Sequence, residues 1–131
     1  KDEVLEYMRE AARAAIDAGA DIVMGHGPHT PLPIEFYRSK PIFYGLGSFV
    51  FHHGHRGKTH GSWLGLMGQI KLNRKNIAEV GFCFVRRNEQ NQTYVCNPVD
   101  EQNTLDALLG DLRKTGCSII IHEQDVFIKE A

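Results

Sequence analysis

Two histidines on a glycine- and proline-rich stretch are the residues whose type and spacing best suit chemistry. His26 and His29 lie three positions apart in the run GADIVMGHGPHT, with Gly27 and Pro28 between them. Neutral imidazole is a common metal ligand in proteins, and a stiff turn can aim two rings at one point. Surface loops also carry such pairs by chance, so the spacing alone is a weak signal. We predict that His26 and His29 form part of a metal site.

The residues before the histidines predict a helix, a stop and a buried strand. Apolar and small residues recur at helical spacing over residues 4–16, Asp2 is of a type favoured at the N-cap, and Gly19 fits the left-handed position past the helix end. Residues 22–24 are a short apolar run typical of a strand covered on both faces. Ligands bind beyond the carboxyl ends of strands in open α/β sheets, so both histidines lie where a site is expected.

The segment after the histidines predicts a hairpin and then a glycine-rich break. Residues 34–37 alternate as a strand, residues 38–40 make the turn, and a second strand covers residues 42–44. Ser48 lies at the break, before a further apolar run at residues 49–51. Two roles are open for its hydroxyl: a hydrogen bond to a ligand, or a hydrogen bond that satisfies the turn.

A histidine-rich segment, HHGHRGKTH, follows at residues 52–60. It becomes positively charged in acid, since an unperturbed histidine gains a proton below about pH 6.5. Three roles are open for it: contact with an anion beside the first two histidines, a second metal site, or a solvated loop. Our candidates for contact with an anionic substrate are Ser48, His52, His53 and His55.

The remaining residues predict a strand-rich part with one more helix. Strands are expected, in chain order, at residues 62–72, 77–87, 94–99, 118–121 and 126–128. Leucines at helical spacing over residues 105–112, closed by Gly116, predict the second helix. We therefore expect a single α/β domain over residues 1–131, with a mixed sheet and flanking helices.

Composition excludes several classes of protein. The 131 residues are 42% hydrophobic with a net charge of −1, which argues against nucleic-acid or membrane-surface binding through bulk positive charge. No apolar run approaches the roughly 20 residues that span a bilayer, and no signal-peptide pattern occurs. A cytoplasmic and a membrane-anchored extracytoplasmic location both stay open for the full protein, as does its oligomeric state. The three cysteines lack Cys-x-x-Cys spacing and are expected to be buried thiols.

Residues 17–51 resemble the CapA-like family, which is associated with poly-γ-glutamate capsule synthesis and related to calcineurin-like metallophosphoesterases. The matching motifs are DAGADIVMGHGPHT and PIEFYRSKPIFYGLGSFVF. Gly27 stands where the family commonly has a second consecutive histidine, and Ser48 stands where it commonly has asparagine. His26 and His29 match the metal-binding Gly-His-x-His positions of the phosphoesterase relatives, with one extra residue between them. The resemblance implies a layered α/β/β/α sandwich of the metallophosphoesterase type, of which this chain forms the carboxy-terminal portion.

The same resemblance implies a cofactor and partners. A divalent metal (Mn, Zn or Fe) would be bound by His26 and His29, in a dinuclear centre whose other ligands come from the missing amino-terminal half of the domain. That half is the expected partner, together with an anionic small-molecule or polymer substrate. Glu35 is one candidate carboxylate, whereas Asp21 lies at the wrong end of its strand.

Three functional hypotheses follow. The first is metal-dependent phosphoester hydrolysis, or capsule polyglutamate synthesis, by the full protein. This chain alone is then expected to be inactive, because two histidines cannot hold a pair of metal ions about 3.5–4 Å apart. The alternative is a non-enzymatic accessory module that binds an anionic polymer such as poly-γ-glutamate. The third is a structural portion whose histidines have no task without a partner.

Overall fold

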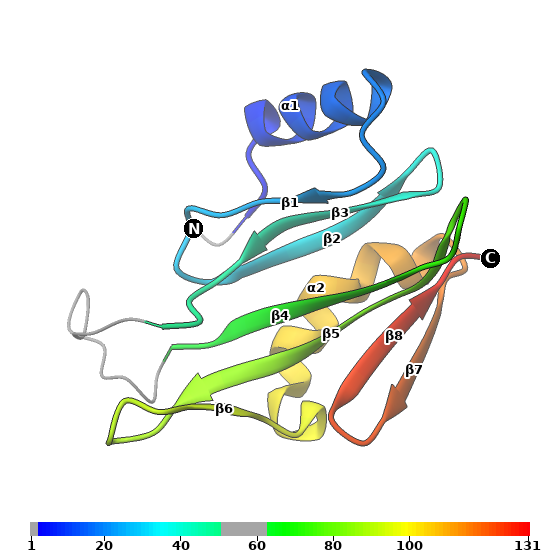
Figure 1. Cartoon of the computed structure of the whole chain (residues 1–131). Coiled ribbons are helices and arrows are strands. Elements are labelled where there is room, and N and C mark those ends of the chain that lie inside the picture. Colours follow the sequence, from blue (N-terminus) through cyan, green and yellow to red (C-terminus); the bar gives the residue numbers. More distant parts are fainter. Residues whose placement is uncertain (1–2, 51–62) are drawn as a thin grey trace.

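The computed structural model describes residues 3–50 and 63–131, which form two β-sheets with two α-helices packed against them (Figure 1). The elements, in chain order, are α1 (Glu6–Asp17), β1 (Val23–Met24), β2 (Pro31–Tyr37), β3 (Lys40–Leu46), β4 (Gly65–Leu72), β5 (Ile77–Arg87), β6 (Thr93–Val95), the 3₁₀-helix η2 (Pro98–Glu101), α2 (Gln102–Lys114), β7 (Ser118–His122) and β8 (Asp125–Lys129). Among the described residues, no helix has the length and apolar character needed to cross a membrane.

The first helix ends as the sequence predicts but begins later. At its end, Gly19 has a φ of +114°, and the N–H of Ala20 donates to the carbonyl of Ala15 at 3.0 Å. This geometry turns the chain back toward β1. At its start, the N-cap is Leu5, which makes no side-chain cap, so the expectation that Asp2 caps the helix is wrong. Asp2 itself lies outside the described residues.

The smaller sheet has the order β1-β3-β2 and carries the histidine loop. Strand β1 pairs with β3 in parallel, Val23 opposite Ile42, and β2 with β3 forms the predicted antiparallel hairpin. Helix α1 covers the outer face of this sheet (Figure 1). The core under α1 consists of Ala12, Ile16, Leu32, Ile42 and Tyr44.

The larger sheet has the order β4-β5-β8-β7, with β6 beside β5. Alternate residues of β5 and β8 face the second, larger core. This core also contains residues of α2, β2 and β3. Its members include Ile34, Phe43, Leu66, Phe82, Phe84, Leu105, Leu109 and Val126, each at most 3% exposed. Complete burial of one such side chain contributes roughly 1.5–3 kcal/mol to folding.

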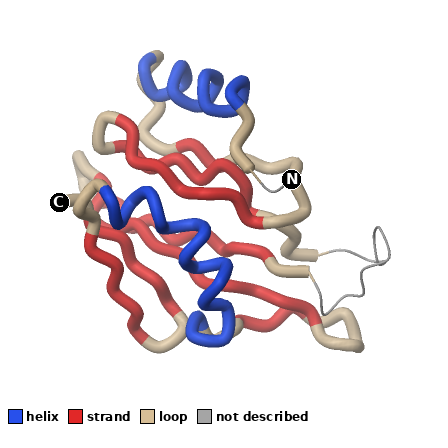
Figure 2. The backbone as a smooth tube through the Cα atoms, turned by 180° about the vertical axis from the view of Figure 1, so that it is seen from behind, coloured by secondary structure: helices blue, strands red, loops and turns tan. Residues whose placement is uncertain are grey.

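The structure confirms the predicted fold class but not the predicted order of layers. The mixed α/β class, with two sheets and flanking helices, is confirmed. Helix α2 packs against β2 and shares the larger core with the smaller sheet, so both cover the same face of the larger sheet (Figure 2). The α/β/β/α layering of the metallophosphoesterase type is therefore not confirmed.

Most strand predictions are confirmed, with three corrections. Strand β1 is not covered on both faces, because Met24 is 42% exposed. Strand β5 has the predicted bounds, and β4 lies inside the predicted range. The expected edge strand at residues 94–99 shortens to Thr93–Val95, because the Asn97 side chain accepts from the N–H of Val99 and starts η2. Of the apolar run at 49–51, residues 49 and 50 are not in a strand. Cys83 and Cys96 are buried free thiols, as expected, whereas Cys117 is a free thiol that is only half-buried.

Candidate functional site

The histidine loop is anchored at the carboxyl end of β1. The N–H of Gly25 donates to the carbonyl of Phe43 at 2.7 Å, and the carbonyl of Gly25 accepts from the N–H of Leu46 at 3.2 Å. The loop therefore leaves the sheet from a fixed point, beside the end of β3. This is the strand-end position at which the sequence placed a site.

His29 is half-buried and lies against Ser48. Its Nδ1 is 3.2 Å from the Ser48 hydroxyl oxygen, and that hydroxyl also lies 3.4 Å from the His29 carbonyl oxygen. The rings of His29 and Trp63 pack edge to face, with 5.2 Å between the ring centroids. Ser48 is only 8% exposed, and its hydroxyl holds the histidine loop through these two contacts with His29. A contact between Ser48 and substrate stays a prediction.

His26 is exposed and has a different set of neighbours. It lines a cavity of about 280 Å³ between α1 and the smaller sheet. The other residues of this cavity are Met8, Ala11, Ala12, Ala15, Val23, Gly25, Phe43 and Tyr44. His26 thus faces the helix side of the sheet, while His29 contacts the segment that leads to β4. The described contacts do not bring the two rings together.

The described residues give an incomplete set of metal ligands. Among residues 3–50 and 63–131, no group of three or more His, Cys, Asp or Glu side chains could hold a metal ion. His26 and His29 can therefore supply part of a metal site at most. The other predicted substrate contacts, His52, His53 and His55, lie outside the described residues. The metal site stays a prediction.

Glu35, the candidate carboxylate, is engaged by three donors. Arg9 Nη1 donates to Oε2 at 3.1 Å, Arg13 Nε donates to Oε1 at 2.9 Å, and the Tyr44 hydroxyl donates to Oε2 at 2.8 Å. Burial, and then the hydrogen bond to Glu35, raise the pKa of Tyr44 to about 12. The hydrogen bond to Glu35 also raises the pKa of Arg13. Glu35 therefore fastens α1 to the smaller sheet, and its carboxylate is occupied by this network.

Sequence reasoning missed this network and the place of Trp63. Arg9 and Arg13 are one helical turn apart, which was the only available signal for a shared acceptor. The strand predicted at residues 62–72 gives Trp63 no special role. No local pattern indicates that it meets a histidine 34 positions earlier in the chain.

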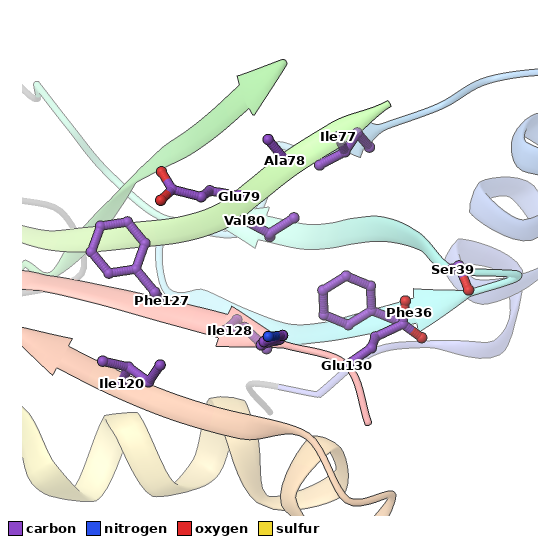
Figure 3. Close-up of a pocket in the computed structure, with 11 residues that line it drawn as sticks. Phe36, Ser39, Ile77, Ala78, Glu79, Val80, Ile120, Phe127, Ile128 and Glu130 are labelled. Atoms are coloured by element: carbon purple, nitrogen blue, oxygen red, sulfur yellow. The ribbon is translucent and has the colours of Figure 1, made fainter. Parts of the chain in front are cut away.

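Another cavity lies away from the histidines. Its volume is about 580 Å³, and it opens between the β2–β3 turn and the ends of β5 and β8 (Figure 3). Phe36, Ile77 and Phe127 give it an apolar wall, and the charged residues Glu79 and Lys129 also line it. It contains none of the predicted site residues and lies at the opposite end of the β4–β5 ladder from His29. We therefore do not assign the candidate site to it.

The fold and the loop define a mixed α/β protein whose candidate site follows a short parallel strand. Comparison with known families identifies this segment: residues 1–53 match the family described as bacterial capsule synthesis protein PGA_cap. The match includes α1, the smaller sheet, His26, His29 and Ser48. Residues 1–53 are therefore similar to the CapA-like family, and the resemblance found over residues 17–51 is confirmed for this part of the chain, which we call the CapA-like segment.

Several named relatives share the same segment. The PGA biosynthesis protein CapA of Bacillus subtilis is 59% identical over 49 residues, which cover 37% of this chain and 13% of the relative. The capsule biosynthesis protein CapA of Bacillus anthracis is 51% identical over 43 residues, 33% of this chain and 10% of the relative. A probable polyglutamine synthesis accessory protein of Mycobacterium tuberculosis is 59% identical over 39 residues, 30% of this chain and 10% of the relative. The matched part thus spans about a tenth of each relative.

Proposed function

We propose that this chain is part of a CapA-like protein that acts in the synthesis of a poly-γ-glutamate capsule. The observation that carries the proposal is the match over residues 1–53, which contains the complete strand-and-loop unit around His26 and His29. The names of the Bacillus relatives, a PGA biosynthesis protein and a capsule biosynthesis protein, support the capsule assignment.

We further propose that the full protein hydrolyses a phosphoester with the help of a divalent metal. The Ser48–His29 contact supports a role for the His29 ring. When Nδ1 carries the proton and donates it to Ser48, Nε2 is the basic nitrogen of the ring. A second group that fixes the orientation of a ligating histidine in this way is usual at metal sites. Bound metal would supply Lewis-acid chemistry, and its remaining ligands would come from residues beyond those described.

A second candidate function is binding of an anionic polymer without catalysis. The network around Glu35 favours it, because the first carboxylate after the histidine loop in the sequence already accepts from Arg9, Arg13 and Tyr44. In this case the histidines and cationic groups of the chain would attract a polyanion. Such binding would weaken steeply with salt, since screening shortens the reach of exposed charges.

Metal content of the full protein separates these proposals. His26→Gln and His29→Gln should each lower the bound metal at least tenfold at limiting metal, because each would remove a ligand. His122→Gln is the matched control, since His122 is exposed on β7 and outside the CapA-like segment. Unchanged metal content in both loop variants would contradict the metal proposal.

Polymer binding provides the second measurement. Binding of poly-γ-glutamate that persists in a chelator, and that falls steeply with added salt, would support the accessory function. If cells carrying the His26→Gln and His29→Gln variants kept normal capsule and normal polymer binding, the capsule function would be contradicted for this loop.

A further inference from the structure

Arg87 is a buried cation for which the described part of the chain supplies no acceptor. It is the last residue of β5 and is only 1% exposed. Its Nε, Nη1 and Nη2 atoms are all buried without a hydrogen-bond partner. Burial lowers its pKa, but a guanidinium remains protonated at neutral pH. Buried charges in proteins are normally paired, so the missing acceptor calls for a ligand.

The neighbouring carboxylates are already used elsewhere. Glu101 binds Arg86, the preceding residue, whose side chain points to the opposite face of β5 because strand residues alternate. On the face of Arg87, the Asp125 carboxylate accepts from the Gln69 side chain at 2.7 Å across the sheet. Neither carboxylate therefore satisfies the guanidinium.

The chain segment that carries Ser48 crosses the same end of the larger sheet. Gly47 makes a bridge with Gly65, and Gly65 pairs with Val85, two residues before Arg87. Thr93 pairs with Arg87, and its hydroxyl donates to the carbonyl of Phe49 at 2.9 Å. The end of β5 and the residues that flank Ser48 therefore form one region.

The same region contains His29 and Trp63. Ser48 contacts His29, and His29 contacts the ring of Trp63. Gly65, the first residue of β4, pairs with Val85 of β5. Trp63 lies two residues before Gly65 and Arg87 lies two residues after Val85, so both lie at the same end of this antiparallel pair. Three kinds of group suited to an oxyanion, a guanidinium, a hydroxyl and an imidazole, thus gather at this end of the β4–β5 ladder.

We propose that Arg87 binds an oxyanion, a carboxylate or a phosphate, at this end of the ladder beside Ser48 and His29. The proposal deepens the proposed function and rests on it only for the ligand class, since poly-γ-glutamate carries carboxylates and a phosphoester carries phosphate. Because Arg87 is 1% exposed, the ligand reaches it only after local opening. The measured affinity is then the intrinsic affinity reduced by the fraction of open molecules.

Trp63, the single tryptophan of the chain, provides the readout. Its emission is followed while the chain is titrated, at constant ionic strength, with inorganic phosphate, glutamate or poly-γ-glutamate; calorimetry repeats each titration. We expect a saturable response to at least one of the three. Arg87→Met should weaken it at least tenfold, and Arg87→Lys should weaken it less, because Lys keeps the charge but loses the fork of donors.

Arg74→Met is the matched control. It makes the same change of charge at an exposed residue between β4 and β5, at the far end of the ladder. Its affinity should equal that of the unaltered chain. A response to phosphate alone supports the proposal with a phosphate ligand, and a response to glutamate or its polymer alone supports it with a carboxylate ligand. Equal affinities of Arg87→Met and the unaltered chain, or no saturable response to any of the three, would overturn it.

The outcomes for this site and for the proposed function are distinguishable. Anion binding that depends on Arg87, together with normal metal content and capsule in the His26→Gln and His29→Gln variants, would keep the anion site and reject the proposed function. Loss of metal in those variants, with anion binding unaffected by Arg87→Met, would reject the anion site and keep the proposed function.

Discussion

Two consecutive arginines at the end of β5 have opposite surroundings. Arg86 donates to both carboxylate oxygens of Glu101, at 2.6 Å from Nε and 2.8 Å from Nη2. Arg87 points to the other face, is 1% exposed and has no acceptor among the described residues. The same side chain therefore serves two purposes one residue apart. Arg86 fastens η2 and the start of α2 to the sheet. An apolar residue at position 87, in contrast, would stabilise the fold more than Arg87 does.

The cluster around Glu35 represents an intermediate case. Arg9 and Arg13 are more than a third exposed, and Glu35 is 18% exposed, so water screens part of their attraction. Their shared acceptor still fastens α1 to the smaller sheet. The arginines therefore rank by how much their charge should stabilise the fold. Arg86, paired and part-buried, comes first; Arg9 and Arg13, paired but screened by water, come second; Arg87, buried without a partner among the described residues, comes last.

The largest effect is expected from Glu101→Gln. The side chain of Glu101 is 10% exposed and that of Arg86 is 25% exposed, so the substitution leaves a mostly buried guanidinium with a weaker partner. We expect the free energy of unfolding to fall by about 2–3 kcal/mol, measured by urea denaturation. Glu79→Gln, at an exposed position of the same strand, is the control. An unchanged urea midpoint in Glu101→Gln would show that the pair with Glu101 does not stabilise the fold, and Arg86 and Arg87 would then not differ in this respect.

Arg87→Met should have an effect of the opposite sign. Replacing an unpaired buried charge with an apolar side chain of similar length should raise the free energy of unfolding by about 1–2 kcal/mol in the absence of ligand. Arg86→Met, in the same assay, should lower it. If both variants lost stability equally, Arg87 would have an acceptor, and the contrast between the faces would fail.

The smallest effect concerns Tyr44 at high pH. Its pKa in the folded chain is about 12, above the ordinary value of about 10, so the folded state holds the phenol proton more tightly than the unfolded state. The resulting stabilisation is complete below pH 10 and is lost as pH rises toward 12. Between pH 10 and pH 11 the loss should be about 1 kcal/mol.

Urea denaturation at pH 8 to 11 checks this expectation for Tyr44→Phe and, as the control, for Tyr7→Phe, since Tyr7 is 67% exposed. Burial also raises the pKa of the Cys96 thiol, to about 11, so that thiol contributes a decline of its own in this window. The first variant should therefore lose about 1 kcal/mol of the decline between pH 10 and pH 11, and the second should keep all of it. A decline of equal size in Tyr44→Phe and in the unaltered chain would show that burial and the hydrogen bond to Glu35 do not raise the pKa of Tyr44.

The local parts of the fold follow from the sequence because their signals are local. The stop at Gly19, the β2–β3 hairpin, the bounds of β5 and the leucine-patterned α2 each depend on periodicity or turn chemistry within a few residues. The packing of α2 beside the smaller sheet depends on contacts between distant segments, which periodicity does not encode. The expected layering came from the family resemblance over residues 17–51, which does not include α2 or the larger sheet.

The candidate site shows the same division. His26, His29 and Ser48 could be chosen from residue type and order, and the structure brings two of them, His29 and Ser48, into contact. Their role in a site stays a prediction. The capture of Glu35 by Arg9 and Arg13 could not be foreseen, because it joins α1 to β2 across more than 20 positions of sequence. Arg87 was also missed, since two arginines before a polar turn resemble a solvated strand end.

The bridge between Gly47 and Gly65 has a mechanical consequence. At this point the two sheets touch through backbone alone: a Cβ on Gly65 would collide with the carbonyl oxygen of Ser48. Because no deformable side chain lies between the two backbones, a displacement of either sheet is transmitted directly to the other. The CapA-like segment and the remainder of the chain are thus mechanically coupled at this bridge. A ligand that displaces one of them should also displace the other.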